Sequence, residues 1–152
     1  MTMQNDLLDI AETLAKLDGG RPRQACLRRA VSSAYYALFH ALASLCAVQL
    51  VGWTKPWEVY TPIYRSLDHS RAKDDFNGWG RRQSSDINLI GQTFIKLQEE
   101  RHRADYHPEP FRGRAETLDL IAQARTAITR LGALPSEDKL RLATQLITRK
   151  RA

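Results

Sequence analysis

The chain has 152 residues, of which 43% are hydrophobic and 26% are charged, so it can form one domain with a hydrophobic core. Its formal net charge of +6 arises mainly in residues 111–152, where nine Lys or Arg stand against four Asp or Glu, and this part either binds phosphate or is simply solvated. The two cysteines favour a reducing compartment, and since no CxxC, HExxH or other spaced ligand set occurs, the sequence indicates neither a metal nor a cofactor.

The first two helices are predicted from hydrophobic periodicity and from residues that end helices. A helix over about residues 7–18 is capped by Asn5 or Asp6 and stops at the two glycines that follow it. A long second helix spans about residues 22–52. Its apolar stripe has a regular three-and-four spacing and consists of Leu27, Val31, Ala34, Leu38, Leu42 and Leu45.

One uncharged stretch of this long helix resembles a membrane span by its length. Residues 30–54 contain no Asp, Glu, Lys or Arg, but they include several polar side chains and few Leu, Ile or Val. We therefore expect a central helix of a bundle and no membrane partner. Because the N-terminus also lacks the pattern of a secretory signal, we expect a cytoplasmic protein.

Residues 53–80 form the least regular part of the chain. Prolines and an Asn-Gly pair break any long helix, although short helices fit at about residues 58–67 and 70–76. The segment carries six aromatic residues: Trp53, Trp57, Tyr60, Tyr64, Phe76 and Trp79. These rings either stack on bases of single-stranded nucleic acid or, as is more common, hold an irregular segment against the bundle.

Three further helices complete an all-α fold. The third long helix spans about residues 85–105, and the proline-rich segment after it must be extended or turned. A fourth helix spans about residues 113–131, and a fifth, basic one spans about residues 136–152. Since no strand pattern occurs, we expect one domain over residues 1–152, an antiparallel bundle of four to five main helices with short helices in the 53–80 connector.

A charged residue interrupts the apolar stripe of the third long helix. The stripe consists of Ile87, Ile90, Phe94 and Leu97. The next position at the same spacing is Arg101, and Asp105 falls beside it. A guanidinium on the core-facing side is costly unless it is paired or faces a wet cleft. Either the two residues form an internal ion pair, which their spacing favours, or Arg101 enters a functional cleft.

A line of polar side chains follows the long second helix on the face opposite its leucines. It consists of Arg29, Ser33, Tyr36 and His40, at steps of four, three and four residues. A single buried polar side chain is usually a satisfied hydrogen-bonding group. Four in register indicate either a polar packing seam, which is the more common case, or a cleft that Arg101 could enter.

Two motifs resemble those of the HEPN family of helical bundles. Residues 29–41, RAVSSAYYALFHA, are similar to the tyrosine-rich second helix of bacterial HEPN domains. Residues 101–106, RHRADY, resemble their Arg-x-x-Ala-Asp-Tyr signature, and Arg101 with His107 fits the broader pattern of Arg, four to six residues and His. The resemblance covers about residues 5–131, whereas the long connector and the basic fifth helix are departures from the minimal bundle.

The resemblance implies a toxin-like endoribonuclease that needs no metal. In HEPN ribonucleases two protomers pair so that both motifs line one cleft, where the 2′-hydroxyl of RNA attacks the adjacent phosphate. Arg101 would hold phosphate oxygens there and His107 would move protons. The supporting residues would be Asp105, Tyr106, Ser33, Tyr36 and His40.

Two other functions remain open. Many HEPN bundles resemble binding modules that work with a minimal nucleotidyltransferase or an antitoxin. In that case this chain would bind a nucleotide, or would be modified on Tyr106. Alternatively, the chain is a structural dimer in which the motif only stabilises the end of the third long helix.

The long second helix also predicts a homodimer. It is apolar or uncharged on both faces, and a small bundle is expected to cover only one of them. The other face would then lie in a two-fold interface, the commonest symmetry of homo-oligomers.

Overall fold

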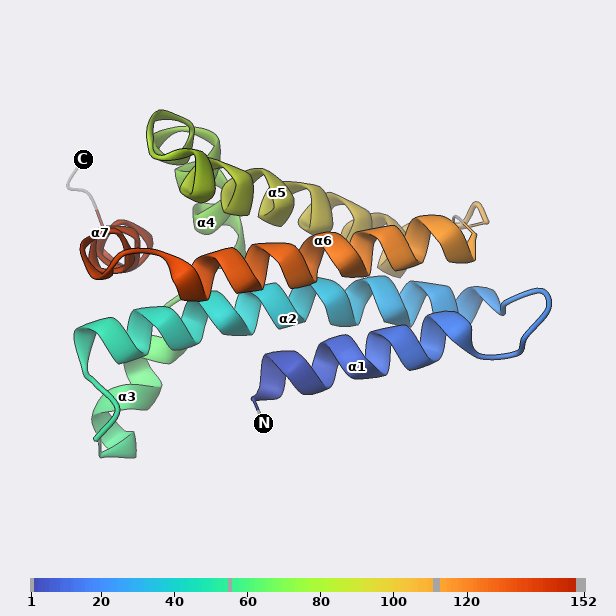
Figure 1. Cartoon of the computed structure of the whole chain (residues 1–152), viewed down its shortest axis with the longest axis horizontal. Coiled ribbons are helices and arrows are strands. Elements are labelled where there is room, and N and C mark those ends of the chain that lie inside the picture. Colours follow the sequence, from blue (N-terminus) through green and yellow to red (C-terminus); the bar gives the residue numbers. More distant parts are fainter. Residues whose placement is uncertain (1, 55, 111–112, 150–152) are drawn as a thin grey trace.

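The computed structural model describes residues 2–54, 56–110 and 113–149, which form helices and no strand. In chain order these are α1 (Met3–Lys16), α2 (Gln24–Leu50), α3 (Trp57–Tyr64), α4 (His69–Asn77), the 3-10 helix η1 (Trp79–Arg82), α5 (Ser85–Tyr106), α6 (Arg114–Ala133) and α7 (Ser136–Ile147). The long helices α1, α2, α5 and α6 lie side by side and run in alternating directions, and α7 crosses one end of this bundle (Figure 1). The predicted all-α bundle is confirmed.

The central element is α2. Helices α1, α3, α5, α6 and α7 all pack on it. Its predicted stripe is buried from Leu27 to Leu42, and Leu45 is half-buried. Within the described residues α2 is the one helix long and apolar enough to cross a membrane, but 67% of that apolar stretch is buried in the bundle. Such burial is typical of a core helix.

The packing around α2 corrects the argument for a dimer that its two apolar faces suggested. Buried alanines lie on several sides of the helix: Ala30, Ala37, Ala41, Ala43 and Ala47. Their small side chains let other helices approach closely, so a single chain covers both faces. The premise that one bundle covers only one face is wrong, and a homodimer needs other support.

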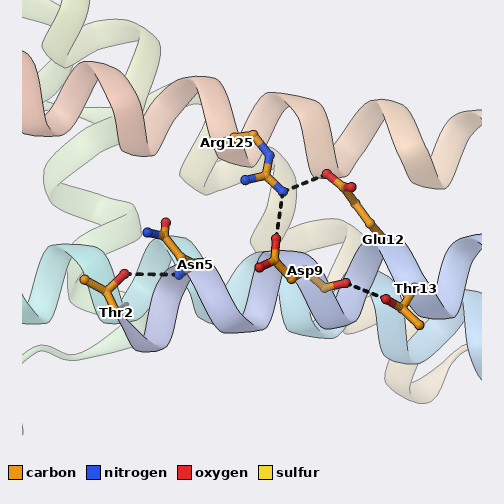
Figure 2. A network of polar contacts seen from close by, with 6 residues as sticks. All are labelled: Thr2, Asn5, Asp9, Glu12, Thr13 and Arg125. Carbon is orange, nitrogen blue, oxygen red and sulfur yellow. Dashed lines mark hydrogen bonds and ion pairs between the residues drawn. The ribbon is translucent and has the colours of Figure 1, made fainter.

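The ends of α1 differ from the prediction. The helix begins at Met3, about one turn before the expected start, because the Thr2 hydroxyl accepts a hydrogen bond from the Asn5 N–H (3.3 Å; Figure 2). It ends at Lys16, ahead of the expected glycine stop. Asp18 then adopts the left-handed conformation (φ 61°), which Asp tolerates better than most residues.

The later helices lie close to their predicted positions, with small shifts at the ends. Helices α3 and α4 match the two short helices expected in the connector, and η1 is additional. The cap of α5 is Ser84, and α6 runs two residues past its expected end, to Ala133, with Gly132 inside the helix. Helix α7 ends at Ile147, earlier than the expected end at about residue 152. Residues 150–152 lie outside the described ones.

Two arginines of α6 fix α1 to the bundle. The Arg125 guanidinium pairs with Glu12 (2.7 Å) and Asp9 (3.6 Å), as Figure 2 shows. Arg114 donates hydrogen bonds to three carbonyl oxygens at and just beyond the C-terminal end of α1. The last carbonyl oxygens of a helix find no hydrogen-bond donor within the helix. Arg114 of α6 supplies such donors at the C-terminal end of α1.

Gly91 marks a close approach between α4 and α5. A Cβ atom at this position would lie 2.7 Å from the Phe76 Cδ1 atom, closer than real contacts allow. Phe76 is fully buried and packs on Phe94, with ring centroids 5.4 Å apart. The connector is thus held to the core by an aromatic ring that occupies the space a side chain at position 91 would need.

Replacing Gly91 with Ala should therefore destabilise the fold by about 1–3 kcal/mol, because Phe76 and α4 must shift. Gly132→Ala is a matched control inside α6: its Cβ would meet nothing within 4 Å, so the change should be neutral or stabilising by up to about 1 kcal/mol. Urea unfolding followed by circular dichroism measures both. Equal stability of the two variants would contradict the close contact.

Candidate functional site

Arg101 lies near the C-terminal end of α5, with 16% of its side chain exposed. Its Nη1 atom is 3.4 Å from the Asp105 carboxylate, which confirms the ion pair expected from their spacing. Its guanidinium carbon lies 5.0 Å from the ring centroid of Tyr35 and 5.7 Å from that of Tyr36, both on α2. Its Nε is buried without an acceptor among the described residues. Arg101 is therefore firmly held, at a cost that its partners only partly offset.

Two histidine–tyrosine pairs, here called the His–Tyr network, extend from this point along α2. The Tyr35 hydroxyl and His69 Nδ1 are 2.5 Å apart, and the same distance joins His40 Nδ1 to the Tyr64 hydroxyl. The first pair connects α2 to α4, and the second connects α2 to α3. Polar groups on the central helix are thus satisfied by the connector.

The aromatic surroundings of His69 keep its ring in place. It stacks on Phe39 with centroids 4.0 Å apart and an interplanar angle of 11°, and Tyr36 meets it edge-on at 6.1 Å. Sequence reasoning missed His69 and Tyr64, since the irregular connector has no periodicity that would orient them. The available signal was the polar line on α2, which needed polar partners from another element.

Burial shifts the pKa values of side chains in the His–Tyr network so that their neutral forms are favoured. Desolvation lowers the pKa of His40, and desolvation together with the positive charge of Arg101 lowers the pKa of His69, against a smaller opposing effect of Asp68. Desolvation likewise raises the pKa of the Tyr64 hydroxyl. The network therefore consists of neutral hydrogen bonds near pH 7.

The predicted residues Tyr106 and His107 lie at the end of α5 and are both exposed. The His107 Nδ1 accepts a hydrogen bond from the Glu109 N–H (3.4 Å), so its ring turns toward the following segment rather than folding back over the helix end. Arg28 of α2 donates to the carbonyl oxygens of His107 (2.7 Å) and Glu109 (2.6 Å). The Tyr106 ring packs beside His102, at 5.0 Å.

Within one chain, Arg101 and His107 do not meet. Their contacts in the described part of the chain have no partner in common. Arg101 lines a groove of about 380 Å³ to which His107 does not contribute; the other lining residues are Lys73, Gln98, Glu99, His102 and Arg103. Three basic side chains and one acidic one make this the basic groove. Each of its three cations is ion-paired, Lys73 with Glu99 (3.6 Å), Arg101 with Asp105 (3.4 Å) and Arg103 with Glu100 (3.4 Å), so a phosphate group that binds there competes with these carboxylates.

The polar line on α2 is largely a packing seam. Ser33, Tyr36 and His40 are half-buried, and Arg29 is exposed. Tyr64 of α3 is hydrogen-bonded to His40, and His69 of α4 stacks on Phe39 and meets Tyr36 edge-on, so the connector packs on this face. Tyr36 is the residue of this line that contacts Arg101.

The free energy of unfolding should fall in mild acid because of His40 and His69. In the unfolded chain these rings take up a proton near pH 6.5, and in the folded chain only at lower pH, so their stabilising effect is complete above about pH 6.5 and is lost as the pH falls toward the folded pKa values. The double variant His40→Gln/His69→Gln should lose less free energy than wild type between about pH 7.5 and pH 5. Chemical denaturation at several pH values measures this. His102→Gln, at an exposed position, is the control, and a double variant with wild-type pH dependence would contradict the assignment.

No group of three or more His, Cys, Asp or Glu side chains in residues 2–54, 56–110 and 113–149 could hold a metal ion. Both cysteines lie on α2 as free thiols, and burial raises the pKa of Cys46 to about 12. Comparison of the chain with protein-family models, with curated proteins and with solved structures gives no match. The resemblance to HEPN domains therefore rests on the two motifs alone.

Proposed function

We propose that this chain is a HEPN-type, toxin-like endoribonuclease that works as a homodimer in the cytoplasm and needs no metal. The observation that carries the proposal is the setting of Arg101, whose guanidinium is held by two tyrosine rings and Asp105 at the wall of the basic groove. A guanidinium fixed in this way can bind a phosphate group with little further loss of side-chain freedom.

The proposed reaction is an internal transesterification of RNA. The 2′-oxygen of one nucleotide forms a bond to the adjacent phosphorus, and the bond from phosphorus to the 5′-oxygen of the next nucleotide breaks. One base takes the proton of the 2′-hydroxyl and one acid gives a proton to the leaving 5′-oxygen, which leaves a cyclic phosphate and a free 5′-hydroxyl. Arg101 stabilises the charge that develops on the phosphate oxygens.

The position of His107 supports a site shared by two copies. An imidazole can both accept and give a proton, but one chain does not bring that of His107 to the basic groove. A two-fold axis next to the ends of two α5 helices supplies a His107 from each copy, one as base and one as acid. Arg28 holds the backbone around His107 through hydrogen bonds of 2.6–2.9 Å and leaves the ring exposed.

Cleavage assays on an RNA oligonucleotide test this function. Arg101→Ala and His107→Ala should each lower the rate by about 100-fold or more, because a positioned acid–base or charged group contributes at least that much. Wild-type activity should persist in chelator. Arg82→Ala, at an exposed arginine that does not line the groove, is the control of matched residue type and should cleave RNA close to the wild-type rate.

The same variants separate catalysis from structure. If the motif only stabilises the helix end, Arg101→Ala lowers the melting temperature by leaving Asp105 unpaired, and His107→Ala changes neither stability nor function. Wild-type protein that is dimeric but cleaves no RNA would overturn the proposed function.

The exposure of Tyr106 favours a second candidate function. Its side chain is 70% exposed, five residues after Arg101 on the same helix. In this candidate function the chain is the partner of a nucleotidyltransferase. The tyrosine oxygen bonds to the α-phosphorus of a nucleoside triphosphate and pyrophosphate leaves. The added phosphate lies near the basic groove and blocks it.

Mass spectrometry tests the modification of Tyr106. After incubation with ATP and a minimal nucleotidyltransferase, the wild-type chain should gain one nucleotidyl group and Tyr106→Phe should gain none. Tyr60→Phe, at a buried tyrosine, is the matched control and should be modified like wild type. An unmodified wild-type chain would rule out this candidate.

A further inference from the structure

The six connector aromatics fall into two groups. Phe76 and Tyr60 are buried and Tyr64 and Trp79 are half-buried, so four of the rings hold the connector to the bundle as expected. Two tryptophans, Trp53 and Trp57, are instead 73% and 68% exposed. Exposure of two such large apolar rings at neighbouring positions is unusual and indicates a binding surface.

Both tryptophans line a hollow of about 400 Å³, here called the aromatic pocket. The start of α1, the end of α2 and helix α3 surround it. Tyr60 and Tyr64 form part of its wall, while Ser44 supplies a hydroxyl group. No charged side chain of the described residues lines it. Apolar rings with a few hydrogen-bonding groups form the usual lining of a site for a planar organic ring.

We propose that the aromatic pocket binds a base of single-stranded RNA. The inference rests on the proposed function for the identity of the nucleic acid and names a subsite of the same substrate. Trp53 and Trp57 provide the stacking faces, and the neighbouring hydroxyl and amide groups meet the edge of the base. Stacking on aromatic side chains is the common way in which proteins hold single-stranded bases without strong sequence preference.

A row of rings joins the pocket to the basic groove. Tyr64 lines the pocket and is hydrogen-bonded to His40. The His40 ring centroid lies 6.5 Å from that of Tyr36, over which the guanidinium carbon of Arg101 lies at 5.7 Å. The pocket and Arg101 are therefore linked by half-buried rings along the face of α2 on which the connector packs. In the proposal one strand reaches both places, with a phosphate at Arg101 and a base in the pocket.

Charge favours a nucleic acid over an apolar peptide as the occupant. The chain has a net charge of +6, which attracts a polyanion to the molecule as a whole; most of this charge lies in residues 111–152, and the cations of the basic groove are ion-paired. An amphipathic helix of a partner, or a second copy of this chain, would use the apolar rings but not the basic groove.

Tryptophan fluorescence tests the proposal directly. A single-stranded 2′-O-methyl RNA of about ten nucleotides has no attacking hydroxyl, so it reports binding without cleavage; the length matches common single-strand site sizes. Titration at fixed salt should quench wild-type fluorescence. Trp53→Ala and Trp57→Ala should each weaken binding about tenfold, as expected for the loss of one stacked base. Leu140→Ala, at a 47% exposed apolar position on α7, should bind like wild type.

Several results would overturn the proposal. Wild-type affinity of both tryptophan variants, or no binding by wild type, excludes a base subsite. Sedimentation that shows the variants to be monomers and wild type to be a dimer assigns the pocket to a protein interface instead. A different result would contradict the proposed ribonuclease activity and leave the base subsite intact: wild type would bind the methylated strand through the tryptophans but would not cleave unmodified RNA.

Discussion

Small side chains on α2 let five other helices reach it, and this packing sets the conditions for every polar group on the helix. Burial of apolar surface is the main favourable term in folding, at about 25 cal/mol per Å². The same burial penalises any polar atom that loses water without gaining a partner. The tyrosines and histidine of α2 therefore depend on partners from the covering helices, and α3 and α4 supply them in the His–Tyr network.

Arg101 extends this constraint to α5. Its charge follows an apolar stripe, and the structure offsets the cost with one carboxylate and two ring faces. These contacts restrict the guanidinium while its tip still lines the basic groove. In the proposed function this core-facing position is also a binding position, where a phosphate would compete with Asp105 for the guanidinium, since the two ring faces carry no net charge.

The fold could be predicted from sequence because the long helices keep a three-and-four spacing over several turns. The Arg101–Asp105 pair was predictable for the same reason, since residues four apart on a helix are neighbours. The partners of Tyr35 and His40 were not predictable, because they come from an irregular segment whose path depends on tertiary packing. The coverage of α2 was underestimated, since hydrophobicity does not indicate how closely alanine lets helices approach. The exposure of Trp53 and Trp57 also depends on where α3 docks, which composition does not determine.

The arginine contacts between α6 and α1 have a consequence for synthesis on the ribosome. Helix α2 is complete at Leu50, but α6, which carries Arg114 and Arg125, is complete only at Ala133. At typical translation rates the nascent chain therefore exposes an apolar 27-residue helix for on the order of ten seconds before its cover is made. Exposed apolar surface of this kind is prone to aggregation, and α2 acquires its final packing only after α6 and α7 have emerged.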